Sequence, residues 1–124
     1  MDQDKTNQPT NDAILAALGA ILEARKQQDP QDSYVASLYT NGLDKILEKV
    51  GEEATEVILA SKNLHANNSH AEHAAHLVAE VADLWFHSLV MLHYQNLDAS
   101  AVLAELASRF GISGHDEKAS RGKS

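Results

Sequence analysis

The chain contains no cysteine, so disulfide bridges and thiolate chemistry are excluded. No uninterrupted apolar run approaches the roughly 20 residues that a membrane-spanning helix needs. The polar start of the chain also lacks the apolar stretch of a secretory signal. These absences predict a soluble cytoplasmic protein without a membrane partner. With 124 residues, the chain is long enough for one domain with one core.

Positive charge is scarce, with 10 Lys and Arg residues against 18 Asp and Glu residues and a formal net charge of −8. Nucleic-acid binding is disfavoured, because contacts to phosphates require a basic face. An acidic protein that handles a phosphorylated small molecule must recruit cations to neutralise both sides. The charge balance therefore favours a metal ion over a nucleic-acid partner.

The alternation of apolar and polar residues that is typical of strands is also missing, whereas apolar residues recur at helical spacing in several segments. A capping residue and a glycine stop bound the last of these segments. Four main helices are predicted, over residues 12–29, 43–62 and 70–95 and between Asp98 and Gly111.

The segments between these helices are short or polar. Residues 1–11 are polar without periodicity and are predicted to be a disordered tail. Residues 33–42 end in an Asn-Gly turn signal and are predicted to be a structured connector. The whole indicates an all-α helical bundle over residues 12–121, followed by a tail at 122–124.

The third helical segment is apolar nearly all round between Leu77 and Leu92, which is typical of the buried central helix of a bundle. Three small companion helices do not cover a helix on all sides, and a large exposed apolar surface is unusual in a soluble monomer. The sequence therefore predicts a homodimer.

A first acidic cluster lies on the second helical segment. Glu52, Glu53 and Glu56 fall within an arc of about 100° on a helical wheel, and Lys45 and Lys49 lie on the same strip. Alone, this pattern favours a solvated face, because glutamate is a good helix former. Glu53, however, borders the apolar stripe and can reach a groove against a neighbouring helix.

A second acidic cluster favours a functional site over a solvated face, because Glu80 and Asp83 interrupt the most apolar stretch of the chain. Their i, i+3 spacing places both on one face, which His73, His76 and His87 share within an arc of about 80°. Burying two carboxylates costs on the order of several kcal/mol per ion without a counter-charge. A basic residue from another helix or a divalent cation must supply it, unless the carboxylates form a polar seam exposed between helices.

Two helices that each carry paired carboxylates can enclose a hard cation, and Mg²⁺ is the expected ion. A di-iron carboxylate bundle also lines its core with glutamate, but it requires Glu-x-x-His on two helices. Here Glu56 follows Glu53 by three residues and Asp83 follows Glu80 by three. Iron is therefore disfavoured.

With these motifs the sequence resembles the phosphoribosyl-ATP pyrophosphatases, a family of the all-α nucleotide pyrophosphohydrolase superfamily that also includes the MazG-type enzymes. The superfamily motif, E-E-x-x-E followed by E-x-x-D on the next long helix, matches the two acidic clusters. The narrower resemblance extends from Ser33 to Arg121. It is carried by Ser33-Tyr34, Ser37-Leu38, the segments Gly42-Leu43-Asp44-Lys45-Ile46 and Lys49 to Val57, and Glu117 to Arg121.

The resemblance implies hydrolysis of phosphoribosyl-ATP between its α and β phosphates, an early step of histidine biosynthesis. The products would be phosphoribosyl-AMP and pyrophosphate, and the acidic motifs would hold Mg²⁺. The implied metal ligands are Glu53, Glu56, Glu80 and Asp83, and the candidate catalytic carboxylates are Glu52, Glu53 and Glu56, among which spacing does not assign the general base.

Cations for the substrate phosphates must come from elsewhere in the chain. Lys49 lies one turn before Glu53 and either binds a phosphate or forms an i, i+4 ion pair with Glu53. Lys118 and Arg121 lie in the C-terminal part of the resemblance and either bind phosphate or belong to a solvated basic tail. Gly51 costs about 1 kcal/mol within a helix, which predicts close packing against a neighbour.

Two rival functions share parts of this pattern. A MazG-type housecleaning pyrophosphatase would keep the fold, metal and bond cleavage but accept ordinary or damaged nucleoside triphosphates. A non-catalytic helical dimerisation module would carry its acidic strips as mere surface, and it predicts neither a Mg²⁺ effect nor pyrophosphate release.

Overall fold

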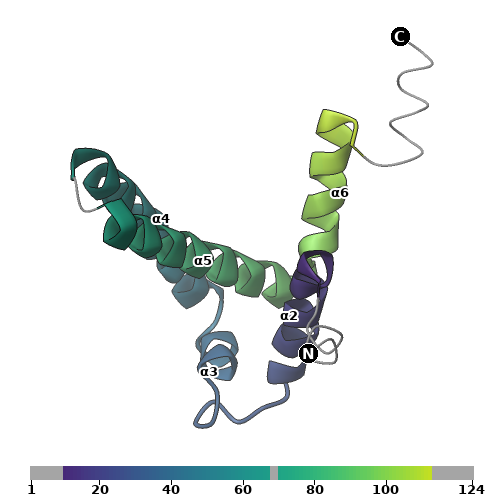
Figure 1. The fold of residues 1–124 in the computed structure, drawn as a ribbon. Coiled ribbons are helices and arrows are strands. Elements are labelled where there is room, and N and C mark those ends of the chain that lie inside the picture. The colour runs from purple at the N-terminus through teal and green to yellow at the C-terminus, as the bar shows by residue number, and fades with distance from the viewer. Residues whose placement is uncertain (1–9, 68–69, 113–124) are drawn as a thin grey trace, which may run out of the picture.

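The computed structural model describes residues 10–67 and 70–112, which form five helices and no strand (Figure 1). The all-α prediction is therefore confirmed for this part of the chain. Residues 1–9 of the predicted tail and the segment with Lys118 and Arg121 lie outside the described residues. The helices are α2 (Asn11–Arg25), α3 (Tyr34–Asn41), α4 (Leu43–Ala66), α5 (His70–Tyr94) and α6 (Ala99–Phe110).

The two longest helices, α4 and α5, run antiparallel and side by side over most of their lengths (Figure 1). The other three helices gather at one end of this pair, where α4 begins and α5 ends, and α6 projects away from it. The two helices that carry the predicted acidic motifs are therefore direct neighbours. This pairing positions the site described below.

Helix α3 is the main departure from the predicted elements, since residues 33–42 were expected to form a connector without a main helix. The Ser33 hydroxyl accepts the Ala36 N–H at 3.1 Å and caps the start of the helix. Gly42, with φ of 95°, ends it in a conformation that favours glycine. Eight residues are too few for helical periodicity to stand out, and buried Leu38 supplies the packing that stabilises so short a helix.

The core is small and lies where α2, α3, the start of α4 and the end of α5 meet. Each of these four helices contributes one fully buried side chain, and burying such a side chain contributes about 1.5–3 kcal/mol. These side chains are Leu22, Leu38, Ile46 and Val90. Toward its other end, the α4–α5 pair has no third helix among the described residues to cover it.

Helix α5 is not covered on all sides within the single chain, as expected for an apolar helix with three small companions, and its cover by a second copy stays a prediction. Val78 is 68% exposed and Trp85 is 60% exposed, because too few neighbours surround the helix. By length and mean hydropathy alone, α5 is also apolar enough to cross a membrane. Only 17% of its most apolar stretch is buried within the chain. Glu80 and Asp83 interrupt this apolar stretch, so the prediction that no uninterrupted apolar run approaches a membrane span is not contradicted. Much of the surface of α5 is apolar and uncovered.

Candidate metal centre

Three of the four predicted metal ligands lie together across the α4–α5 pair. Glu53 comes from α4, and Glu80 and Asp83 come from one face of α5, as their i, i+3 spacing requires. One carboxylate oxygen from each residue lies within 4.8 Å of the other two. A single small cation can therefore contact all three side chains after minor rotamer adjustment.

The carboxylates are less buried than their apolar sequence context predicted. The Glu80 side chain is 16% exposed, Glu53 is partly buried, and Asp83 is exposed. The difference arises because only two helices form this part of the molecule. The cluster is consequently exposed to solvent at Asp83.

The electrostatics of the cluster favour a cation. Burial, followed by the negative charges of Asp83 and Glu80, raises the pKa of the Glu53 carboxyl above its ordinary value. His76 Nε2 lies 3.5 Å from Glu80 Oε1, so a basic side chain contacts the cluster. Three carboxylate oxygens form the hard donor set that Mg²⁺ and Mn²⁺ prefer, so the residues present fit the predicted ion.

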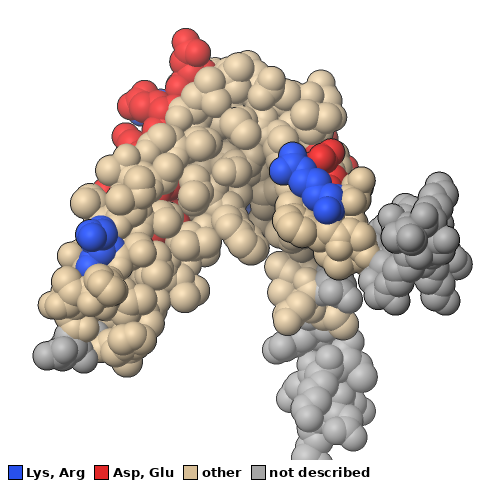
Figure 2. All heavy atoms as spheres, turned by 90° about the horizontal axis from the view of Figure 1, so that it is seen from above, with Lys and Arg blue, Asp and Glu red and all other residues tan. Residues whose placement is uncertain are grey.

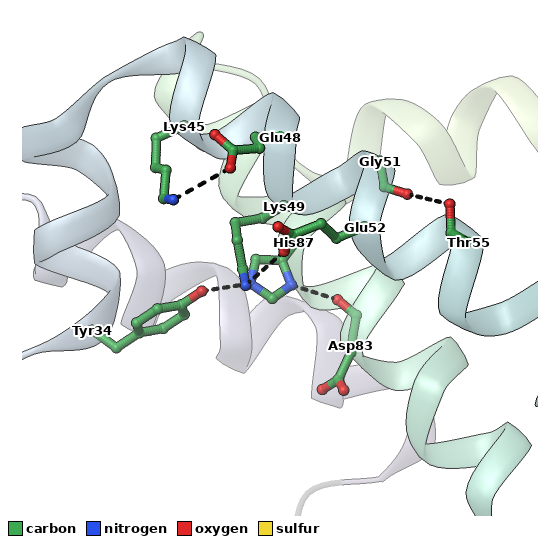
Figure 3. Close-up of polar contacts among 9 residues, drawn as sticks. All are labelled: Tyr34, Lys45, Glu48, Lys49, Gly51, Glu52, Thr55, Asp83 and His87. Carbon is green, nitrogen blue, oxygen red and sulfur yellow. Dashed lines mark hydrogen bonds and ion pairs between the residues drawn. The ribbon is translucent and has the colours of Figure 1, made fainter.

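Glu52 and Lys49 form an ion pair beside the cluster (Figure 3). Lys49 Nζ lies 3.0 Å from Glu52 Oε2, so the predicted ion-pair partner of Lys49, Glu53, is corrected to Glu52. The hydrogen bond from Lys49 lowers the pKa of Glu52, and the same bond raises the pKa of Lys49. Such an exposed pair contributes little to stability.

Glu56 and Gly51 lie on parts of α4 that no other described helix covers. Glu56 is exposed and does not belong to the group of three carboxylates found among the described residues. Gly51 is exposed too, and a Cβ built there would meet no atom within 4 Å. The predicted close helix packing at Gly51 is therefore wrong.

His87 lies one helical turn after Asp83 on α5 and is only 5% exposed. Its Nε2 is 2.9 Å from the Tyr34 hydroxyl, and its Nδ1 is 2.9 Å from the backbone oxygen of Asp83 (Figure 3). The helical wheel placed His87 on the carboxylate face. It gave no sign of Tyr34, which is distant in sequence and was marked only by the Ser33-Tyr34 element of the family resemblance.

Fold and site together define a class: an all-helical protein whose carboxylates cluster across one helix pair, as suits a divalent cation and a phosphorylated substrate. The sequence pattern of the family described as phosphoribosyl-ATP pyrophosphohydrolase matches residues 15–110. A protein of Hydrogenovibrio crunogenus (strain DSM 25203 / XCL-2) named phosphoribosyl-ATP pyrophosphatase is 54% identical over 110 residues, covering 89% of this chain and 94% of that protein. The chain therefore belongs to the phosphoribosyl-ATP pyrophosphohydrolase family, and the predicted family and hydrolase activity are confirmed.

Proposed function

We propose that this protein hydrolyses phosphoribosyl-ATP to phosphoribosyl-AMP and pyrophosphate with the help of Mg²⁺, as an early step of histidine biosynthesis in the cytoplasm. The observation that carries the proposal is the convergence of Glu53, Glu80 and Asp83 within 4.8 Å in a member of this family. A merely solvated acidic face would have no reason to bring together carboxylates from two helices.

In this proposal Glu53, Glu80 and Asp83 hold the ion. When bound there, Mg²⁺ supplies neutralisation of the phosphate oxygens and polarisation of the phosphorus. Glu52 and Glu56 lie on the exposed strip of α4, where either carboxylate is accessible to accept a proton from the attacking water. Glu56 is also one turn from Glu53, so a substrate-induced rotamer change would add it as the fourth predicted ligand.

The substrate phosphates require further positive charge. Lys49 is placed to donate to a phosphate oxygen once it leaves Glu52. Lys118 and Arg121 are proposed as additional phosphate-binding residues on the strength of their sequence context alone. Neutralisation by these cations would lower the barrier for approach of a triphosphate to an acidic protein.

The test is incubation of the protein with phosphoribosyl-ATP, ATP or dCTP in parallel, each with Mg²⁺ and with EDTA, followed by assay of pyrophosphate and orthophosphate. Mg²⁺-dependent release of pyrophosphate from phosphoribosyl-ATP in clear preference to the other two is expected. Comparable rates with all three would favour the MazG-type alternative. Release of orthophosphate with a nucleoside diphosphate would contradict the proposed bond cleavage.

We further propose that a second copy of the chain covers the apolar surface of α5 and α6. Figure 2 shows the molecule as two arms around a hollow, with most acidic side chains over the α4–α5 arm, a smaller group of basic and acidic side chains on the other arm, and uncharged surface between the two groups. An uncovered apolar surface of this extent is unusual for a monomer. A cavity of about 310 Å³ between the arms is lined by Leu15, Trp85, Ser88, Leu89, Leu92, Ala99, Val102, Leu103 and Leu106.

Light scattering coupled to size-exclusion chromatography tests the dimer. The parent protein is expected at twice the mass of one chain, and Leu106→Glu is expected to shift it to a monomer, because a charge would be buried without a partner at the interface. A parent that elutes as a monomer across the whole accessible concentration range would contradict the dimer.

A further inference from the structure

A hydrogen-bonded pair formed by Tyr34 and His87 ends on the backbone of one carboxylate residue of the cluster. The backbone oxygen of Asp83 can only accept, so the 2.9 Å contact requires a proton on Nδ1 of His87, which donates it. In the neutral ring Nε2 is then an acceptor, and the Tyr34 hydroxyl donates to it at 2.9 Å. The backbone contact thus fixes Nδ1 as the donor, and in the neutral ring it also fixes the direction of the Tyr34 bond (Figure 3).

This pair connects two parts of the chain that frame the carboxylates. Tyr34 is the first residue of α3, which joins α4 through the single residue Gly42, whereas His87 and Asp83 belong to α5. The Tyr34 ring also stacks on Phe86 with the ring centroids 6.4 Å apart, and Phe86 meets His87 edge-on at 5.0 Å. Packing thus orients both rings, and the hydroxyl adds a directional link between α3 and α5.

Asp83 has little else to hold it in place. Its side chain is exposed, and its carboxylate points away from the imidazole in Figure 3. The negative charges of Glu53 and Glu80 repel it in the absence of a cation. Glu80, in contrast, is mostly buried and has His76 at 3.5 Å. The orientation of Asp83 therefore depends on the helical turn between residues 83 and 87, to which His87 adds a second bond.

We propose that Tyr34 and His87 are positioning residues that hold the Asp83 turn of α5 in register with Glu53 on α4, so that three carboxylates are preorganised for a divalent cation. The inference rests on the proposed function, since it assumes that these carboxylates bind metal. In this proposal both side chains act on the metal site through the backbone of Asp83. Removing groups that orient metal ligands typically weakens metal affinity by 10- to 100-fold.

The experiment compares Tyr34→Phe with Tyr39→Phe in direct titrations with Mn²⁺ followed by electron paramagnetic resonance. Tyr39 is a matched control because it lies on the same helix and its hydroxyl donates to the Leu22 carbonyl at 3.1 Å, toward α2 and not toward the carboxylates. Each variant keeps its ring and loses one hydroxyl hydrogen bond. Both are expected to melt a few degrees lower than the parent.

Only Tyr34→Phe is expected to weaken Mn²⁺ binding, by about tenfold. In steady-state assays its rate at low Mg²⁺ should fall, and excess Mg²⁺ should restore most of it, because the defect lies in affinity for the ion. His87→Asn keeps an amide near the Nδ1 position and loses the acceptor for Tyr34. Adding Tyr34→Phe to His87→Asn should then weaken Mn²⁺ binding no further, since both changes break the same link.

Two results overturn the inference and separate it from the proposed function. Equal Mn²⁺ affinity in Tyr34→Phe and Tyr39→Phe would show that the pair is only structural, while leaving the metal site intact. Absence of Mn²⁺ binding by the parent protein would remove the metal site itself, and the positioning role with it.

Discussion

Two histidines on the same helix, His87 and His93, are almost completely buried, and each ties α5 to an earlier helix. His87 is 5% exposed and meets Tyr34 of α3, whereas His93 is 3% exposed and meets Glu23 of α2. The partner of His87 is a neutral hydroxyl. The partner of His93 is a carboxylate, with Nδ1 and Oε2 2.6 Å apart.

The surroundings of the two rings indicate different roles, one beside the carboxylate cluster and one in the packing of α2 against α5. Both ring nitrogens of His87 have partners, and one of them leads to the Asp83 backbone. Nε2 of His93 has no hydrogen-bond partner among the described residues and lies against Gly19 of α2. His87 therefore supports the carboxylate cluster, whereas His93 attaches α2 to the end of α5. Burial of a histidine alone does not tell which of these roles it has.

The largest effect is expected at the carboxylates that His87 supports. Asp83→Asn and Glu53→Gln should each lower kcat/KM for phosphoribosyl-ATP at least about a hundredfold, because loss of a direct metal ligand exceeds the effect of losing an orienting group. Far-ultraviolet circular dichroism should show unchanged helical content. Glu48→Gln is the control, since Glu48 is exposed on α4 and only pairs with Lys45 at 3.5 Å. Near-normal activity in either variant would remove that residue from the metal site.

A smaller effect, on stability rather than activity, is expected at His93. Glu23→Gln should lower the free energy of unfolding by about 1 kcal/mol, because a charged acceptor of the buried imidazole is lost. The hydrogen bond from His93, and after it that from Lys26, lowers the pKa of Glu23 below its ordinary value of 4.5. The stabilisation is therefore present above this value and is lost as the pH falls through the lowered pKa.

Urea denaturation at several pH values measures this contribution. The difference between parent and Glu23→Gln should shrink as the pH falls below 4.5 and through the lowered pKa of Glu23, because the parent carboxylate becomes protonated. Glu105→Gln is the control, because Glu105 pairs with Arg109 on the exposed face of α6 and contributes little. A difference that stays constant over this pH range, or a loss of Mn²⁺ affinity in Glu23→Gln, would break the distinction between the two histidines.

The smallest effect is expected at two helical glycines. Gly51→Ala should raise the free energy of unfolding by about 0.5–1 kcal/mol, because alanine restricts the unfolded chain and the Cβ meets nothing within 4 Å. Gly19→Ala should gain less, because its Cβ would lie 3.4 Å from Nε2 of His93. Thermal or urea denaturation measures both. An equal gain at Gly19 would mean that α2 packs more loosely on His93 than the contacts indicate.

Features encoded by local sequence could be predicted. The periodicity of the long helices placed Glu53 at the border of one apolar stripe and Glu80 with Asp83 on one face of the next helix. The grouping of these residues, with Glu56, as metal ligands was implied by the family resemblance, and the structure brings three of the four together. The end signals of α6 were also correct: Asp98 accepts the Ala101 N–H at 3.4 Å, and Gly111 adopts φ of 63°. In these cases the determining groups lie within a few residues of one another.

Features that depend on tertiary packing could not be predicted. Helix α3 is too short for its pattern to be distinct, and the exposure of Asp83 depends on which helices are absent around it. Lys49 pairs with Glu52 and not Glu53, a choice between side-chain rotamers that spacing leaves open. The Tyr34–His87 contact joins residues 53 positions apart, so only the assembled fold reveals it.

The central claim is that the carboxylates of α4 and α5 form a metal site and not a structural network of charges. The most direct measurement is a thermal melt of the parent and of Asp83→Asn, each with EDTA and with millimolar Mg²⁺ at constant ionic strength. Metal that binds only the folded protein adds about 2.7 kcal/mol at about a hundredfold excess over Kd, so Mg²⁺ should raise the parent Tm by several degrees.

Without metal, Asp83→Asn should melt higher than the parent, because removing one negative charge relieves repulsion from Glu53 and Glu80. The same variant should lose most of its response to Mg²⁺. This opposite pair of changes is the predicted result. Equal Mg²⁺ shifts in the two proteins, or a variant that melts lower than the parent with and without metal, would contradict the account.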